Sequence, residues 1–273
     1  MIARIAIAAL LATPCALAAA VPKAPSNPIV GGKDAAHHDW LAMIRMNGSP
    51  TANCGGTIIA ENILLTAGHC SVDESGKPSN PDGMLVSAVR YDQSKSTAEE
   101  GGIDYDVTKI IPHPEFTQNP VPLNDLAIWV LKRKTAGGKT QPTASLSTDA
   151  TTPASLIVSG WGTLSSGGEQ PDILQEVSVP IMDQKKCQQY LGGAENAPDS
   201  TICAGKDEGG VDSCQGDSGG PLFSTNAGQA TLYGIVSWGN GCAAAKQPGV
   251  YTRVSSFADW IKEQIAANSG GAH

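Results

Sequence analysis

The chain has 273 residues and a net charge of −8; hydrophobic residues make up 41% of it and charged residues 16%. This composition excludes an intrinsically disordered chain and a coiled coil. No run of Lys or Arg longer than three residues occurs, which makes nucleic acid and anionic membranes poor partners. The 31 glycines and 18 prolines favour many short strands joined by turns.

The first 20 residues have the pattern of a secretory signal peptide. Arg4 precedes an apolar run that ends in small residues, Ala18-Ala19-Ala20. An uncleaved membrane anchor is the alternative, but the run is barely long enough and contains Pro14. We therefore predict an extracellular, secreted protein. The next segment, VPKAPSNP at residues 21–28, is interpreted as a short propeptide.

From residue 29 onward, short apolar runs separated by turn residues predict an all-β fold. In chain order they are LAMIRM, GTIIA, NILLTAG, MLVSAV, DVTKII, DLAIWVL, SLIVSGW, LQEVSVPIM, PLF, TLYGIVSW and GVYTRV. A polar stretch near 132–152 divides these runs into two halves, which fits barrels or sandwiches. The end of the chain predicts one amphipathic helix at about 256–267, with Ser256 and Asp259 as a capping box.

Removal of a signal peptide would take away one of the seven cysteines, Cys15, and leave six. An even number in an oxidising compartment predicts three disulfides, with many connectivities open. Metal binding is disfavoured because no C-x-x-C pair occurs. Sequential pairing would close short loops, each worth about 3 kcal/mol. These pairs are Cys54–Cys70, Cys187–Cys203 and Cys214–Cys242.

The stretch DSCQGDSGGP at 212–221 contains a candidate nucleophile, Ser218, within a G-x-S-x-G pattern. A nucleophilic serine needs a base, and the base needs an orienting acid. His69 follows an apolar strand, and Asp125 precedes one, where an unpaired carboxylate would be costly. A turn residue satisfied by backbone N–H groups is the alternative for Asp125. In α/β-hydrolases the acid and histidine follow the serine, and here only His273 does, so that family is excluded.

Six short motifs make the chain similar to trypsin-like members of the chymotrypsin family of serine proteases. They are IVGG (29–32), TAGHC (66–70), NDLAI (124–128), SGWG (159–162), DSCQGDSGGP (212–221) and SWGNGC (237–242). The resemblance implies a protease domain at 29–273 with two six-stranded antiparallel β-barrels, at about 29–140 and 141–254, and the active site between them. The non-basic propeptide and three disulfides resemble fungal and microbial trypsins more than vertebrate ones.

The resemblance also implies roles for single residues. His69, Asp125 and Ser218 would form the catalytic triad, and the backbone N–H groups of Gly216 and Ser218 the oxyanion hole. Asp212 would lie at the floor of the primary pocket and select Arg or Lys. The other substrate-binding positions would be Ser213, Ser237, Trp238, Gly239 and Gly249.

Activation is expected to involve Ile29 and Asp217. In the family, a cut before this isoleucine frees an α-amino group that pairs with the aspartate, so a zymogen is expected. Pro28 stands where digestive trypsinogens carry Lys or Arg, and we expect a dipeptidyl or proline-directed activating peptidase instead of self-activation. Gly68 replaces the usual alanine beside the histidine, and we expect it to be tolerated with slightly more local freedom.

No cofactor and no metal are expected, because residues 71–106 match the family's calcium loop poorly. The expected partners are protein or peptide substrates, protein inhibitors and an activating peptidase; the expected state is a monomer, with no nucleic acid or membrane partner. A pseudoprotease that only binds is the alternative function, disfavoured by the complete triad. A chymotrypsin-like preference is opposed by Asp212.

Overall fold

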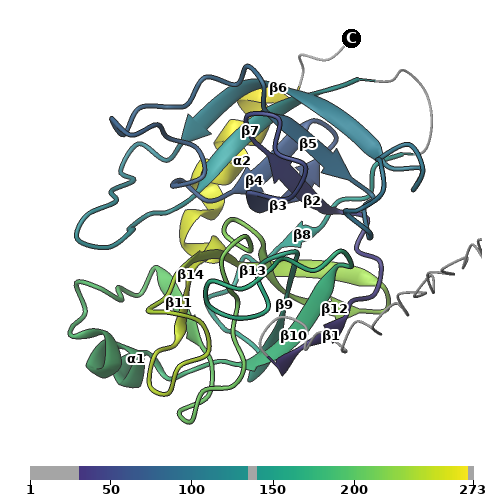
Figure 1. Ribbon diagram of the computed structural model, residues 1–273. Coiled ribbons are helices and arrows are strands. Elements are labelled where there is room, and N and C mark those ends of the chain that lie inside the picture. Colours follow the sequence, from purple (N-terminus) through teal and green to yellow (C-terminus); the bar gives the residue numbers. More distant parts are fainter. Residues whose placement is uncertain (1–30, 135–139, 270–273) are drawn as a thin grey trace, which may run out of the picture.

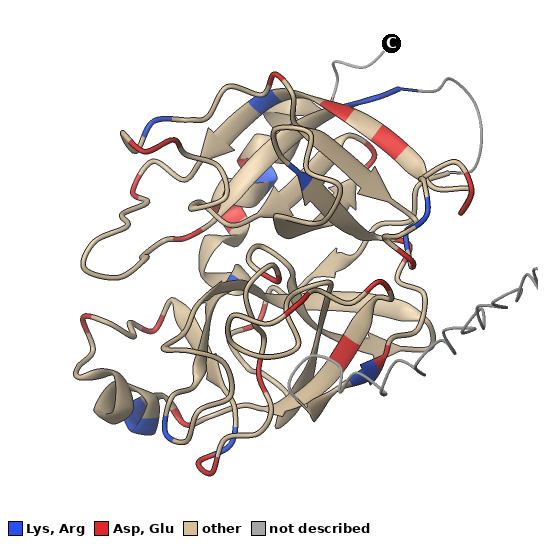
Figure 2. Ribbon diagram, in the orientation of Figure 1, with Lys and Arg blue, Asp and Glu red and all other residues tan. Residues whose placement is uncertain are grey.

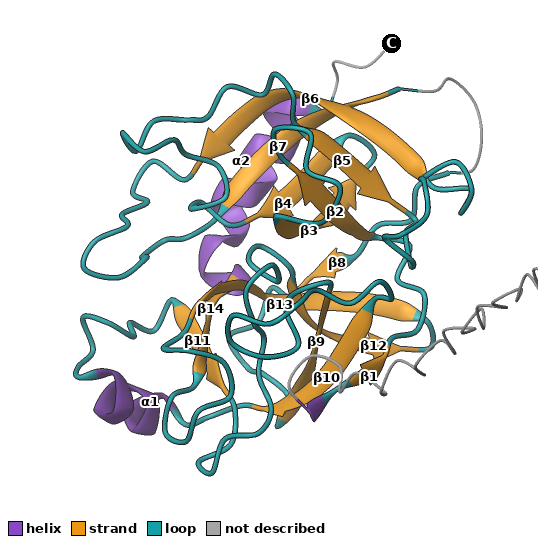
Figure 3. Ribbon diagram, in the orientation of Figure 1, coloured by secondary structure: helices purple, strands orange, loops and turns teal. Residues whose placement is uncertain are grey.

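The structure, a computed structural model, describes residues 31–134 and 140–269 (Figure 1). Within them the chain forms two halves, one above the other in this view, each built mainly from strands (Figures 1 and 3). The predicted signal peptide, the predicted propeptide and Ile29 lie outside the described residues. No helix of the described ranges is long and apolar enough to cross a membrane.

The first half is a closed barrel whose strands pair in the order β2-β3-β4-β7-β6-β5, all antiparallel. The strands are β2 (Leu41–Arg45), β3 (Cys54–Ala60), β4 (Ile63–Thr66), β5 (Leu85–Ala88), β6 (Ile103–Pro112) and β7 (Ala127–Arg133). β4 is buried throughout, whereas the first half of β6 alternates between buried and less buried positions. Trp129 of β7 is fully buried, and its indole N–H is satisfied because it donates to Ser71 Oγ at 2.8 Å.

The second half is a sheet in the order β1-β10-β9-β12-β13-β14-β11, with β8 paired in parallel to β13. The strands are β1 (Lys33–Asp34), β8 (Ser145–Leu146), β9 (Ser155–Gly160), β10 (Gln175–Pro180), β11 (Thr201–Ala204), β12 (Pro221–Asn226), β13 (Gln229–Trp238) and β14 (Gly249–Arg253).

The prediction of two closed, six-stranded antiparallel barrels is therefore confirmed in part. The first half fits it, whereas the second half is an eight-stranded sheet with one parallel pair, β8 with β13. In the second half, β10 and β11 do not form a ladder, but they meet at an isolated bridge between Ile181 and Ala204. The Gly205 N–H also donates to the Pro180 carbonyl at 2.9 Å. The sheet thus curls until the end of β10 meets the end of β11. The pairing between them extends no further, because the chain leaves β10 for a helix.

That helix, α1 (Gln184–Leu191), is not predicted from the sequence; the Asp183 carboxylate caps it by accepting from the Lys186 N–H at 3.1 Å. The predicted C-terminal helix is present as α2 (Ala258–Asn268), after a 3-10 turn, η2 (Val254–Phe257). The predicted capping box is wrong, because Ser256 lies within η2 and α2 has no side-chain cap. α2 packs against the barrel through Ile261, which is fully buried.

Candidate active site

His69 and Asp125 meet at the ends of two paired strands of the barrel. His69 follows β4, Asp125 precedes β7, and these strands are neighbours. His69 Nδ1 lies 2.8 Å from Asp125 Oδ2, and the His69 backbone N–H donates to Asp125 Oδ1 at 2.8 Å. One carboxylate therefore holds both the backbone and the ring of the histidine.

The Asp125 carboxylate is also held from the second half of the molecule. It is 1% exposed, and Oδ2 accepts from Ser237 Oγ at 2.5 Å. The Asp125 carbonyl accepts from Thr252 Oγ1 at 2.7 Å. Burial alone would lower the pKa of His69, but the charge of Asp125 and its hydrogen bond outweigh burial, and the pKa is raised. The ring is thus oriented and made a better proton acceptor.

Ser218 comes from the second half, in the turn before β12. Its carbonyl accepts from the Gly55 N–H of β3 at 2.8 Å, and the next N–H, of Gly219, donates to the Val236 carbonyl at 2.8 Å. These bonds fasten the serine turn to strands of both halves. The predicted nucleophile and the histidine–aspartate pair therefore come from different halves of the fold, as expected from the resemblance.

A cavity of about 200 Å³ opens beside Ser218. It is lined by Asp212, Ser213, Cys214, Gln215, Ser218, Val236, Ser237, Trp238, Gly239, Gly241, Cys242 and Gly249. All six predicted substrate-binding residues are in this lining. The structure therefore gathers residues from three separate segments around one hollow next to the predicted nucleophile.

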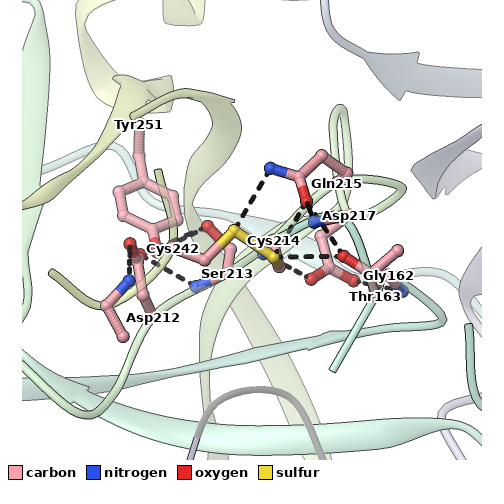
Figure 4. The surroundings of a disulfide bond; sticks show 11 residues. Gly162, Thr163, Asp212, Ser213, Cys214, Gln215, Asp217, Cys242 and Tyr251 are labelled. Atoms are coloured by element: carbon pink, nitrogen blue, oxygen red, sulfur yellow. Dashed lines mark hydrogen bonds between the residues drawn. A yellow bond between two sulfur atoms is a disulfide. The ribbon is translucent and has the colours of Figure 1, made fainter. Parts of the chain in front are cut away.

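Asp212 is the acidic side chain of this cavity and is only 2% exposed. Oδ1 accepts from the Ser213 N–H at 2.8 Å and Oδ2 from the Ala243 N–H at 3.1 Å, while the Tyr251 hydroxyl lies 3.3 Å from Ser213 Oγ (Figure 4). Burial raises the pKa of Asp212 to about 7, against the effect of these hydrogen bonds. A buried carboxylate is costly to ionise without a partner, and a cationic guest would supply that partner. The cavity therefore favours a cationic guest.

Asp217 lies across the Cys214–Cys242 disulfide from Asp212 (Figure 4). It is fully buried, with Oδ1 accepting from the Gly162 N–H at 2.8 Å and Oδ2 from the Cys214 N–H at 2.9 Å. Burial raises its pKa to about 6. Its predicted partner, the amine of Ile29, lies outside the described residues, so this pairing stays a prediction.

The three disulfides pair as predicted: Cys54–Cys70, Cys187–Cys203 and Cys214–Cys242. The first joins β3 to the turn of His69, and the third joins the segments on either side of the cavity. The described residues contain one group of three potential metal ligands, Cys54, His69 and Cys70. Its two cysteines are bonded to each other and offer no thiolate, so this group is no metal site.

The family model described as Trypsin matches residues 29–261. The chain belongs to the trypsin family. It is 41% identical to Trypsin-1 of Astacus astacus over 239 residues, which cover 86% of this chain and 98% of that protein. It is 36% identical to the Trypsin of Saccharopolyspora erythraea over 244 residues, 88% of this chain and all of that protein. Serine proteinase stubble of Drosophila melanogaster is 39% identical over 258 residues, but the chain covers 31% of its length.

This trypsin-family chain is thus a hydrolase of peptide bonds, a trypsin-like serine endopeptidase. Some polar contacts of the protease are not predicted from its sequence. Ser237 is expected only to bind substrate, yet its hydroxyl donates to Asp125, 112 positions earlier in the chain. Near Asp212, the Ala243 N–H and the Tyr251 hydroxyl belong to residues whose contacts no sequence motif predicts.

The space beside Gly68 of the protease is filled by Phe116. A methyl group at Gly68 would lie 2.8 Å from Phe116 Cδ2 and 3.1 Å from Asp125 Oδ1. The greater local freedom expected at this position is therefore limited by an aromatic ring. We predict that Gly68→Ala lowers the free energy of unfolding by about 1 kcal/mol, because the ring must shift. Thermal denaturation measures the free energy of unfolding, and adding Phe116→Leu to Gly68→Ala should recover the lost stability. A Gly68→Ala variant as stable as the parent would contradict the tight contact.

Proposed function

We propose that the chain is a secreted serine endopeptidase, made as a zymogen, that cleaves peptide bonds after Arg or Lys through His69, Asp125 and Ser218. The observation that carries the proposal is the buried carboxylate of Asp212 in the cavity beside Ser218. A cationic side chain in that cavity would pair with Asp212, and its scissile carbonyl would then lie near the serine.

In the proposed acylation, Ser218 Oγ forms a bond to the scissile carbonyl carbon while His69 takes the hydroxyl proton. The electron pair of the carbonyl π bond moves to its oxygen, which the N–H groups of Gly216 and Ser218 stabilise. The carbonyl re-forms as the C–N bond breaks, and His69 gives its proton to the leaving amine. Asp125 keeps the Nδ1–H tautomer of the ring and stabilises the imidazolium.

Deacylation repeats these steps with water. His69 accepts a proton from the water as its oxygen attacks the ester carbon of acyl-Ser218. When the ester C–O bond breaks, the proton passes to Ser218 Oγ and the new carboxylic acid leaves. The His69–Asp125 contact at 2.8 Å supports both halves of the cycle, because it holds the ring in one orientation.

Specificity in this proposal comes from Asp212, together with Ser213, which offers a further hydrogen bond to the guest. Gly239 and Gly249 would leave the entrance open for a long side chain, and Ser237 and Trp238 at the end of β13 would pair with the substrate backbone. An uncharged guest would leave the Asp212 carboxylate buried and unpaired, at a cost of several kcal/mol (about 3–5).

The proposed maturation has two cuts. Residues 1–20 would be removed during secretion and residues 21–28 by an activating peptidase, and the freed amine of Ile29 would pair with Asp217. Proteins are the proposed partners, as substrates or as inhibitors of the same site, and the enzyme is proposed to act as a monomer. The Lys and Arg residues of the described ranges are scattered over both halves (Figure 2), which supports protein partners over nucleic acid.

Cation binding should depend on pH through Asp212. Because burial raises its pKa to about 7 in the free enzyme, a bound amidinium must displace a proton below pH 7. We predict that the Kd of benzamidinium rises by about tenfold per pH unit as the pH falls below 7, and is constant above it. Calorimetry in buffers of different ionisation enthalpy should count about one proton released near pH 6 and none near pH 9. A constant Kd from pH 5 to 9 would contradict a raised pKa.

The decisive experiment compares peptide substrates with Arg, Lys, Phe or Leu before the cut. The full chain is secreted by a host, and the processed enzyme is assayed with each substrate. We expect cleavage after Arg and Lys only. A preference for Phe or Leu would refute the role of Asp212, and a protein that cuts nothing and resists acylation at Ser218 would be a binding module.

A further inference from the structure

Two glutamine side chains hold the peptide groups of Ala52 in the loop before β3. Gln170 Nε2 donates to the Ala52 carbonyl at 2.8 Å, and the Ala52 N–H donates to Gln93 Oε1 at 3.1 Å. Gln93 Nε2 in turn donates to the carbonyl of Pro171 at 2.7 Å. Ala52 is 4% exposed and Gln93 8% exposed. We name Gln93 and Gln170 the glutamine clamp; it ties the segment 162–171 of the second half to the barrel.

The same segment contacts the peptide group between Gln215 and Gly216. The Thr163 N–H donates to the Gln215 carbonyl at 2.7 Å. Gly216 has a φ of 97°, and a Cβ built on it would lie 2.5 Å from Gln170 Nε2 and 3.1 Å from Gly162 Cα. The carbonyl of this peptide is thus held by one end of the segment, and the Gly216 Cα is covered by the Gln170 amide at the other end.

This arrangement fixes where the Gly216 N–H points. In a trans peptide the N–H and C=O groups point in opposite directions, so an anchored Gln215 carbonyl sets the direction of the Gly216 N–H. A glycine at this φ has wide conformational freedom, and the peptide would rotate readily if the segment moved away. An oxyanion donor is effective only when it is oriented before the reaction.

We propose that Gln170 is a positioning residue that keeps the Gly216 N–H aimed at the oxyanion, with Ala52 and Gln93 as its anchors. This inference rests on the proposed function, in which Gly216 is an oxyanion donor. The effect falls mainly on the transition state, because the negative oxygen exists only there. Binding of a cation at Asp212 does not use the Gly216 N–H and should be indifferent to the clamp.

The test compares two ligands on Gln170→Ala, prepared from the full chain as the secreted, processed enzyme. In a peptide aldehyde that ends in Arg, the carbonyl carbon is attacked by Ser218 Oγ. The former aldehyde oxygen of this adduct then lies in the oxyanion hole, so the affinity of the aldehyde depends on that hole. Benzamidinium occupies only the cavity of Asp212. We expect kcat on an Arg amide to fall about tenfold with KM nearly constant, the Ki of the aldehyde to rise about tenfold, and the Kd of benzamidinium to stay within about twofold.

Gln229→Ala is the matched control, since Gln229 is an exposed glutamine of the same half with hydrogen bonds of 3.3–3.4 Å. The kcat of this variant and its affinities for both ligands should equal those of the parent.

Gln93→Met is the second variant. It loosens the anchor without altering Gln170, and it should shift the aldehyde Ki in the same direction. The inference is overturned if Gln170→Ala keeps the parent's aldehyde Ki, or if both ligands weaken in parallel. An inactive parent enzyme would instead refute the proposed function.

Discussion

We expect Asp212→Ser to lose about a thousandfold in kcat/KM on Arg and Lys substrates. Asp212 is 2% exposed and lies in the cavity beside Ser218. In the variant a cationic guest would be buried without its counter-charge, and breaking a buried ion pair costs about 3–5 kcal/mol. Steady-state kinetics with matched Arg and Leu substrates measures the loss, which should be absent or reversed for Leu.

Two controls separate specificity from folding. Acylation of Ser218 by a small uncharged reagent should proceed at the parent's rate, because the His69–Asp125 pair is untouched. Asp207→Ser is the control variant. Asp207 is an exposed acid five positions before Asp212 and pairs with Lys186, so its removal should leave kcat/KM unchanged. Full activity of Asp212→Ser on Arg substrates would show that another group selects the cation.

Asp125→Asn is expected to lower kcat by about four orders of magnitude, the size of loss for this change in the triad template of this enzyme family. Asp125 Oδ1 accepts from the His69 N–H, so the asparagine oxygen would take that position. Its NH₂ group would then face His69 Nδ1 in place of Oδ2 and donate to it. The proton of the neutral ring would move to Nε2, which could no longer accept the proton of Ser218.

The same change should lower the pKa of His69, because the charge of Asp125 is what raises it above the value set by burial. The pH dependence of kcat/KM reports that shift. Asp106→Asn is the matched control: this aspartate is 56% exposed and pairs with Lys134, so both activity and profile should be unchanged. Activity of Asp125→Asn within about tenfold of the parent would contradict the assigned tautomer role.

Much of the fold follows from local sequence. Runs such as ILLT in β4 and AIWV in β7 are mostly apolar and include β-branched or aromatic residues, and they form barrel strands that pair directly. The helix α2 follows from its apolar periodicity, but its first turn does not, because Val254–Phe257 adopts a 3-10 turn instead of a capped α-helical start. α1 escapes prediction because its eight residues are mostly polar and only Cys187 and Leu191 are buried.

The sequence by itself determined the family, through motifs in fixed order, and with it the residue types for acylation and cation recognition. Those properties are local, since a serine in a glycine-rich turn and a histidine after an apolar strand are read from neighbouring residues. Only the tertiary structure decided how Asp125 is held, because Ser237 and Thr252 belong to strands of the other half. The burial of Asp212 and the contact of Gln170 with Gly216 likewise arise between distant segments, whose packing no local pattern encodes.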